Sequence, residues 1–402
     1  MIQMAGDQSL LKRINRIALV RIVKAQPGLS RVDLAQHTGL TKTTVGLLVQ
    51  ELIDEGWLRQ GQAAVGQAVG RRPLPLTLDP ERIALLGAEI GVDYINVVAC
   101  NLQGEVLFSR MAAYRHNVVA RSVHSISGLI AKAHAEVLGQ GRRPLGIGVG
   151  VPGMVDIRDN MLRFAPNIGW HDLALGSLIE EELRELGCAG LHVSVLNEAN
   201  AAALSEYVFG AEPHTGPLVY LSMGIGLGAG IVLGDRLYLG HDGLAGEIGH
   251  TILHRNGPRC ACGRRGCAET LVSQRAVSHN ATHRASPILS IKELADRIAN
   301  KDPDAVRAAK ESGKYLGLLI QNLGNTINPA VIVLGGPLCQ LGELFVDTAI
   351  KTMKARAGRY DYQRLSVRLC RFGLNACAVG AAGSVFHEFL HSFDDSETRV
   401  RG

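Results

Sequence analysis

Apolar side chains in the first part of the chain recur at the spacing of an amphipathic helix. They stand at Leu11, Ile14, Ala18 and Ile22. Residues three to four positions apart share one face of a helix, so this spacing predicts a first helix. Pro27-Gly28 is expected to end it, because proline cannot continue a helix and glycine favours the turn that follows.

Two shorter helices are predicted next. Ser30 and Asp33 form an S-x-x-D start signal for a helix that carries Val32, Leu34 and Ala35. Gly39 marks a turn, and Thr41 is placed to cap a third helix that ends at Gly56. The apolar face of this third helix comprises Val45, Leu48, Val49, Leu52 and Ile53. Two short helices joined by a glycine turn, after a packing helix, are typical of a helix-turn-helix.

The segment that follows favours a β-wing. "WLRQ" and "GRRPLPLTLD" are predicted to be two strands joined by a Gly/Gln/Ala loop, so residues 1–80 are expected to form a winged helix-turn-helix DNA-binding domain. The start of the third helix offers hydroxyls and an amine for phosphates and base edges, at Thr41, Lys42, Thr43 and Thr44. Arg71 and Arg72 suit a narrow minor groove. The alternative is a small helical bundle with a polar surface.

From Leu86 onward the pattern is that of an α/β protein. "LLGAEIGVDYINVVACNLQGEVLFSR" alternates and breaks at Gly91 and Gly104, which predicts a strand meander. Helices are expected near 123–138 and 177–186, with a buried strand at "LGIGVGVPG" between them. "LHVSVLNEANAAALSEYVFG" predicts a strand, a polar turn and a helix.

The same theme then starts again. "PLVYLSMGIGLGAGIVLGDRLYLG" repeats the glycine-broken strands, "AVIVLGGPL" adds a buried strand, and "ACAVGAAGSVFHEFLHSF" predicts a closing helix. We therefore expect two α/β lobes, residues 81–195 with 385–402 and residues 196–384. The cleft between two such lobes is a common ligand site.

Composition narrows the class of protein. A chain of 402 residues is long enough for two or three domains, and its net charge of +5 is mild, so a nucleic-acid partner must be met by a local patch. No apolar run approaches the roughly 20 residues of a membrane span, and the N-terminus has no apolar signal core, so a cytoplasmic protein is expected. Five scattered cysteines are interpreted as buried thiols: Cys100, Cys188, Cys339, Cys370 and Cys377.

Several motifs together resemble the ROK family, which contains repressors and sugar kinases. They are "VPGMVD", "PNIGW", "NEANAAALSE", "GIGLGAGI", "AGEIGH", "CACGRRGCAE" and "VLGG". With the winged module included, the resemblance runs from about Leu10 to Phe389. It implies an actin-like (ribonuclease H-like) two-lobe sugar-binding domain behind a DNA-binding domain.

The remaining three cysteines predict a metal site. Cys260, Cys262 and Cys267 offer three thiolates in one glycine-rich loop, and either His250 or His254 would complete a tetrahedral set for Zn²⁺. The ROK resemblance favours His250. A site with four protein ligands leaves no position for water, so the zinc is expected to be structural. The alternative is free or disulfide-linked cysteines.

The resemblance also implies a sugar site in the cleft. The matching positions are Asn167, Asn197, Glu198, Glu247, His250 and Glu269. His250 would bind zinc through one ring nitrogen and face the sugar with the other. The alternative interpretation is that these amides and carboxylates cap turns.

A sugar kinase is the rival function. In ROK kinases an acidic residue acts as general base on the sugar hydroxyl, and Glu198 stands at that place here. The first phosphate loop of the kinases is expected to be lost, because "EIGVDYI" has no Thr-Lys pair and Asp93 would repel a triphosphate. Met223 stands where the second phosphate loop has a small hydroxyl residue. No enzymatic activity is therefore expected.

These observations predict a sugar-responsive transcriptional regulator, and we expect a repressor. It would bind a pseudo-palindromic double-stranded operator as a homodimer or homotetramer, and a sugar effector in the cleft would alter that binding. The alternative output is control by a protein partner, such as a component of sugar transport.

Overall fold

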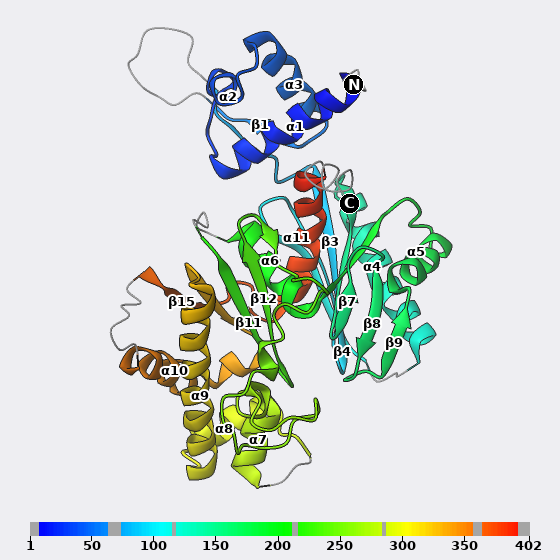
Figure 1. Cartoon of the computed structure of the whole chain (residues 1–402). Coiled ribbons are helices and arrows are strands. Elements are labelled where there is room, and N and C mark those ends of the chain that lie inside the picture. The colour runs from blue at the N-terminus through cyan, green and yellow to red at the C-terminus, as the bar shows by residue number, and fades with distance from the viewer. Residues whose placement is uncertain are drawn as a thin grey trace, which may run out of the picture.

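The computed structural model describes residues 8–62, 74–114, 118–210, 216–283, 287–356 and 364–392. A small winged helical unit stands on a larger α/β body (Figure 1). In the described part of the chain, no helix combines the length and the apolar character that a membrane crossing requires.

The N-terminal unit has the three predicted helices and two short strands. They are α1 (Gln8–Ala25), α2 (Arg31–Thr38), α3 (Lys42–Asp54), β1 (Leu58–Gln60) and β2 (Leu76–Leu78). Ser30 and Asp33 form a reciprocal capping box at the start of α2, and the Thr41 side chain accepts the Thr44 N–H at the start of α3. Gly39 ends α2 in the left-handed conformation, with a φ of 70°. The start and stop signals in the sequence therefore act as predicted.

The buried face of α1 differs from the predicted apolar stripe. Ile17, Val20 and Val23 are buried, whereas Leu11 and Ile14 are exposed. The first half of α1 contacts α3 and its C-cap through the ion pairs Lys12–Glu51 and Arg16–Glu55. These long polar side chains hold the two helices together at that end, so no apolar surface covers Leu11 and Ile14.

The two wing strands pair antiparallel. The register joins Leu58 to Leu78 and Gln60 to Leu76, with Leu58 and Leu76 fully buried. The arginines of the predicted wing, Arg71 and Arg72, lie outside the described residues.

The first large sheet has the strand order β10-β6-β3-β4-β5. Strands β3, β4 and β5 form the predicted antiparallel meander, and β6 and β10 add in parallel. Its elements, with the small antiparallel sheet β7-β8-β9, are β3 (Ile83–Ile90), β4 (Tyr94–Cys100), β5 (Val106–Ala113), α4 (Val119–Gly139), β6 (Arg143–Val151), β7 (Met154–Asp156), β8 (Met161–Ala165), β9 (Trp170–Leu173), α5 (Leu175–Glu185) and β10 (Val193–Asn197).

The second large sheet has the order β13-β12-β11-β14-β15 and repeats the theme of an antiparallel meander with parallel additions. Its strands are β11 (Leu218–Met223), β12 (Leu227–Leu233), β13 (Arg236–Leu237), β14 (Val331–Gly335) and β15 (Ser366–Leu369). The helices beyond it are η1 (Ile248–His250), η2 (Ala268–Thr270), α7 (Gln274–Thr282), α8 (Ile291–Ala299), α9 (Pro303–Ile327), η3 (Pro337–Leu341), α10 (Glu343–Ala355) and η5 (Gly373–Asn375).

Two helices lie between the large sheets. α11 (Ala376–His391) packs on β3 and β6, α6 (Glu198–Phe209) packs on β11 and β12, and the two helices pack on each other (Figure 1). Glycine makes this approach possible: a Cβ at Gly148 would lie 1.8 Å from the Ala381 carbonyl oxygen, and one at Gly380 would lie 1.7 Å from that of Ala201. The repeated sheets and paired central helices form the expected two-lobe actin-like fold.

The C-terminal end of α11 contacts the winged unit. Trp57 stacks on Phe389 with ring centroids 4.0 Å apart and an interplanar angle of 12°, and Arg21 contacts the ring of His391. One apolar cluster runs from the interior of the winged unit through this joint to α6 and α11. Figure 1 shows the end of α11 directed at the winged unit.

Candidate functional site

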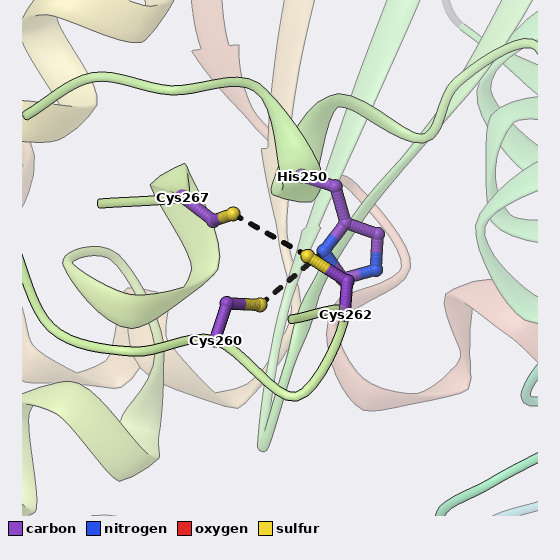
Figure 2. A group of neighbouring side chains, drawn as sticks. All are labelled: His250, Cys260, Cys262 and Cys267. Atoms are coloured by element: carbon purple, nitrogen blue, oxygen red, sulfur yellow. Dashed lines mark hydrogen bonds between the residues drawn. The ribbon is translucent and has the colours of Figure 1, made fainter. Parts of the chain in front are cut away.

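Three cysteines and one histidine meet in a single cluster. His250, at the end of η1, faces the sulfurs of Cys260, Cys262 and Cys267 (Figure 2). The Nδ1 atom of His250 lies 3.6 Å from the Cys260 sulfur, and the sulfurs of Cys262 and Cys267 are also 3.6 Å apart. All four ligand atoms lie within 4.8 Å of one another.

The backbone of the cysteine loop holds this arrangement. The Cys260 N–H donates to the Arg264 carbonyl, and Gly263 N–H donates to the Cys260 carbonyl, which closes a tight turn around the first two cysteines. Ile252 and Cys267 form an antiparallel bridge that joins the loop to the chain just after His250. Gly266 packs against the backbone of His254, where a Cβ would be 1.6 Å from the carbonyl oxygen. Sequence-distant ligands are thus brought together by main-chain contacts.

The cluster fits a tetrahedral zinc ion. A Zn–S bond of about 2.3 Å places two sulfurs of one tetrahedron roughly 3.8 Å apart, close to the separation observed for Cys262 and Cys267. His254 does not join this group; its ring makes an edge contact with Tyr315, with centroids 6.3 Å apart. Hydrogen bonds from the Arg264 backbone and side chain lower the pKa of the exposed Cys262 thiol to about 6, which favours the thiolate that a metal requires.

A large cleft lies beside the cluster and between the two large sheets. It has a volume of about 1200 Å³ and is lined by elements of both. All six residues that the resemblance assigns to a sugar line this cleft: Asn167, Asn197, Glu198, Glu247, His250 and Glu269. Asn167 and Glu247 are exposed, and the other four are half-buried. His250 lines the cleft while its Nδ1 atom faces the cysteines. This position agrees with the expectation that one ring nitrogen faces the cysteines and the other faces the cleft.

Asn197 has a structural use as well as a place in the cleft. Its side-chain oxygen accepts the N–H groups of Ala199 and Asn200 as the cap of α6, and its amide nitrogen donates to the Gly153 carbonyl at 2.7 Å. One N–H of the amide therefore stays available for a ligand. The side chain ties α6 to the loop that precedes β7.

Two carboxyl groups at the inner end of the cleft are held away from water. Burial raises the pKa of Glu89 to about 8, and its carboxyl accepts a 2.5 Å hydrogen bond from the Tyr94 hydroxyl. Burial also raises the pKa of Glu198 to about 7. In the sequence, Glu89 stands out only as part of the altered loop "EIGVDYI". Its hydrophobic neighbours in β3 gave no signal that a carboxyl group would be buried there.

The segments to which the resemblance assigns the kinase phosphate loops are the turn at Gly91 and the end of β11. The ring of Tyr94 lies directly on Gly91, where a Cβ would be 2.4 Å from the ring, and the Gly91 N–H donates to the Tyr94 carbonyl. Asp93 is exposed at the same turn and lines the cleft. Met223 is fully buried at the end of β11, so its side chain does not face the cleft.

The residues predicted to contact DNA lie at the start of α3. Thr41, Lys42 and Thr43 are exposed, and Thr44 is half-buried. The Thr41 and Thr44 hydroxyls are 2.9 Å apart and take part in the helix cap. Leu47, one turn further along, is exposed as well, and the sequence pattern gave no signal for it.

Comparisons with known proteins agree with this architecture. The ROK family pattern matches residues 85–387, and the IclR helix-turn-helix domain matches residues 17–62. The xylose repressor of Caldicellulosiruptor bescii is 30% identical over 96% of this chain and 98% of its own length.

Two solved structures share the fold. A ROK family transcriptional regulator, described as a homologue of the E. coli MLC protein, covers 94% of this chain and 98% of its own, with a TM-score of 0.76 and 27% identity. A ROK family glucokinase from Streptomyces griseus, solved with glucose and AMPPNP, covers 74% of this chain and 98% of its own, with a TM-score of 0.63 and 28% identity. With its two-lobe body, its cysteine cluster beside the cleft and its N-terminal helix-turn-helix, the chain belongs to the ROK family.

Proposed function

We propose that this protein is a sugar-responsive DNA-binding transcriptional regulator that represses its target genes. The winged unit would bind the operator, and a sugar in the cleft would alter that binding. Repressors among the full-length relatives support this function, and so does the direct contact between the winged unit and the body that carries the cleft.

The charge of the cleft indicates which chemical class of ligand it binds. Five carboxyl groups line the described cleft against a single arginine, Arg264. Raised pKa values favour the neutral acid form of Glu89 and, in part, of Glu198, so the negative charge comes mainly from Asp93, Glu247 and Glu269. Carboxylates accept hydrogen bonds from hydroxyl groups but repel phosphates. The cleft therefore suits an uncharged polyhydroxyl ligand and disfavours a sugar phosphate or a nucleotide.

The zinc ion is proposed to be held by His250, Cys260, Cys262 and Cys267. When bound, it would act as a structural cross-link and fix the His250 ring. The chain itself then presents the Nε2 atom of His250 toward Glu247, whose carboxylate oxygen lies 3.9 Å away. Glu269 follows Cys267 by two residues and accepts the Leu227 N–H at 3.4 Å. A rigid cysteine loop would thus position three ligand-binding side chains at one wall of the cleft.

The DNA-binding surface is proposed to comprise Thr41, Lys42, Thr43, Thr44, Arg71 and Arg72. The Thr41–Thr44 cap would fix the start of α3, so that Lys42 and Thr43 reach phosphates and base edges in the major groove. Arg71 and Arg72 would enter the minor groove. A dimer would place two such units on half-sites about one helical turn, or a multiple of it, apart.

α11 is proposed to transmit the sugar signal. Its first residues, Ala376 and Cys377, line the cleft, and its last turns stack on Trp57 through Phe389. Closure of the cleft would shift α11 between the two sheets and tilt the winged unit. Because both half-sites must be met at once, a small tilt weakens the two contacts together.

Phosphate transfer is the second candidate, and Glu198 is the observation that favours it. Its carboxyl lines the cleft with a pKa of about 7, as a general base would require. The covered turn at Gly91, the exposed Asp93 and the surplus of acidic groups oppose a bound triphosphate. We infer that the protein is not a kinase, and ATP consumption with hexoses, pentoses and N-acetyl sugars tests this directly.

The proposed function is tested with operator DNA and a sugar panel. Full-length protein is titrated onto a duplex from its own promoter region, with free sugars and their phosphates added separately. We expect a free sugar to change the DNA affinity and the thermal stability, and the phosphates to do neither. If no sugar changes the DNA affinity but a protein of sugar transport releases the DNA, the effector is that protein partner and not a sugar. Indifference to promoter DNA would contradict the function itself.

A further inference from the structure

Leu47 has an unusual position on α3. Leu47 is 65% exposed, which is the highest value among the exposed large hydrophobic residues in the described part of the chain. The buried face of the same helix is formed by Val45, Leu48, Val49 and Leu52, so the apolar core of the unit is complete without Leu47. Most of the Leu47 side chain therefore lies outside the packed interior of the winged unit.

The neighbours of Leu47 define the surface to which it belongs. Thr43 is exposed one turn earlier, at the i, i+4 position that shares the same helix face. On one flank, Gln50 accepts a hydrogen bond from Arg31 of α2 at 3.1 Å and donates to Asp54 at 2.9 Å. On the other flank, Glu51 pairs with Lys12 of α1 at 2.7 Å. Polar contacts to α1 and α2 thus border a narrow strip, in which Leu47 follows Thr43.

Only one group in the major groove of B-DNA offers an apolar contact on a base edge. It is the C5 methyl of thymine, which distinguishes an A·T pair from the others. A leucine on the strip of α3 that starts with Lys42 and Thr43 is chemically matched to that methyl. We propose that Leu47 reads sequence by packing its side chain against the C5 methyl of a thymine in each half-site. This proposal rests on the DNA-binding role of α3 proposed above.

The size of the effect follows from the surface removed from water. Burying one methyl-sized group corresponds to about a fourfold change in affinity. We therefore expect each contacted thymine to contribute about fourfold, and two half-sites of a dimer to contribute roughly the product.

The test removes the methyl from the DNA and the side chain from the protein in turn. A duplex is selected from a random library with the full-length protein, and each thymine is then replaced singly by deoxyuridine, which lacks only the methyl. We expect the native chain to lose about fourfold at one thymine in each half-site. Leu47→Ala removes the contact from both half-sites, so it should bind the thymine duplex about as weakly as the native chain binds a duplex with deoxyuridine at both contacted positions. Replacing those thymines should not weaken its binding further.

Leu138→Ala is the matched control, because Leu138 is 49% exposed on α4, in the body. It should behave as the native chain does. The proposal is overturned if the native protein binds equally well with deoxyuridine at every position. It is also overturned if the replacement lowers the DNA affinity of Leu47→Ala as much as that of the native chain. A change of oligomeric state in Leu47→Ala, measured by light scattering, would assign the leucine to a subunit contact and overturn it too. If no duplex is selected at all, DNA recognition by α3 fails, and the proposal fails with it.

Discussion

Single residues in the cleft combine a proposed role in ligand binding with a structural role. Asn197 caps α6 while it lines the cleft, and His250 faces the cysteines with one ring nitrogen while it lines the cleft. The resemblance of the "NEAN" and "GEIGH" motifs to the ROK family implied a place in the cleft for these two residues. The buried carboxyl of Glu89 could not be located in this way, since its burial depends on Tyr94 and on the packing of α11.

The raised pKa of Glu89 predicts a pH-dependent stability. The folded chain keeps the proton up to about pH 8, whereas an unfolded glutamate releases it near its ordinary value of 4.5. Between these values the unfolded state binds fewer protons, so the free energy of unfolding falls as pH rises, by at most about 1.4 kcal/mol per pH unit. Glu89→Gln keeps an oxygen for the Tyr94 hydroxyl and removes this slope.

Urea unfolding at pH 5 and pH 8 measures the effect. The variant should be more stable than the native chain at pH 8, and the difference should shrink toward pH 5. Glu185→Gln, at an exposed position on α5, is the control and should follow the native chain. Equal pH slopes for native protein and Glu89→Gln would show that this carboxyl is not held protonated.

Cys262→Ser tests the metal assignment. Serine is a poor zinc ligand, so the purified variant should contain much less than the one equivalent of zinc expected for the native chain, measured by elemental analysis. Its affinity for sugar should also fall, because His250 would lose its fixed orientation. Cys339→Ser, at a half-buried cysteine outside the cluster, should keep its zinc. Retention of one equivalent by Cys262→Ser would remove that residue from the ligand set.

At the scale of elements, local sequence signals determine where helices and strands begin and end, whereas tertiary contacts determine which of their faces are buried. Caps and glycine turns in the sequence predicted α2, α3 and both strand meanders, because those signals act within a few residues. The buried face of α1 was predicted less well, because it is chosen by ion pairs from Lys12 and Arg16 to α3. The joint between Trp57 and Phe389 could not be predicted, since 332 positions separate the partners in the sequence and only the fold brings them together.

The joint gives a prediction for α11. Phe389→Ala removes the stacking partner of Trp57 but no residue of the cleft or of α3. The variant should bind DNA and sugar with affinities near those of the native chain, while the change in DNA affinity caused by sugar shrinks by several-fold. Phe108→Ala, a half-buried phenylalanine on β5, is the control and should keep the full response. A full response in Phe389→Ala would exclude this joint from the coupling.

At the scale of the whole molecule, one continuous apolar cluster joins the winged unit to the helices beside the cleft. It extends from Leu34 and Val49 of the winged unit, through Trp57 and Phe386, to Ala201 of α6. The repeated pattern of strands predicted the two lobes and the cleft between them. It did not indicate where the winged unit rests on the body, because contacts between domains leave no periodic signal in the sequence.

A molecule built in this way must obey reciprocity. If sugar weakens operator binding by a given factor, operator DNA must weaken sugar binding by the same factor, because the four binding steps form a closed thermodynamic cycle. Sugar at 100 times its dissociation constant should stabilise the free protein by about 2.7 kcal/mol, and it should stabilise the DNA complex by less. Calorimetric titration of sugar into free and DNA-bound protein measures the second factor, and DNA titration with and without sugar measures the first. Unequal factors would mean that the two titrations do not connect the same species, as happens when one ligand also changes the oligomeric state.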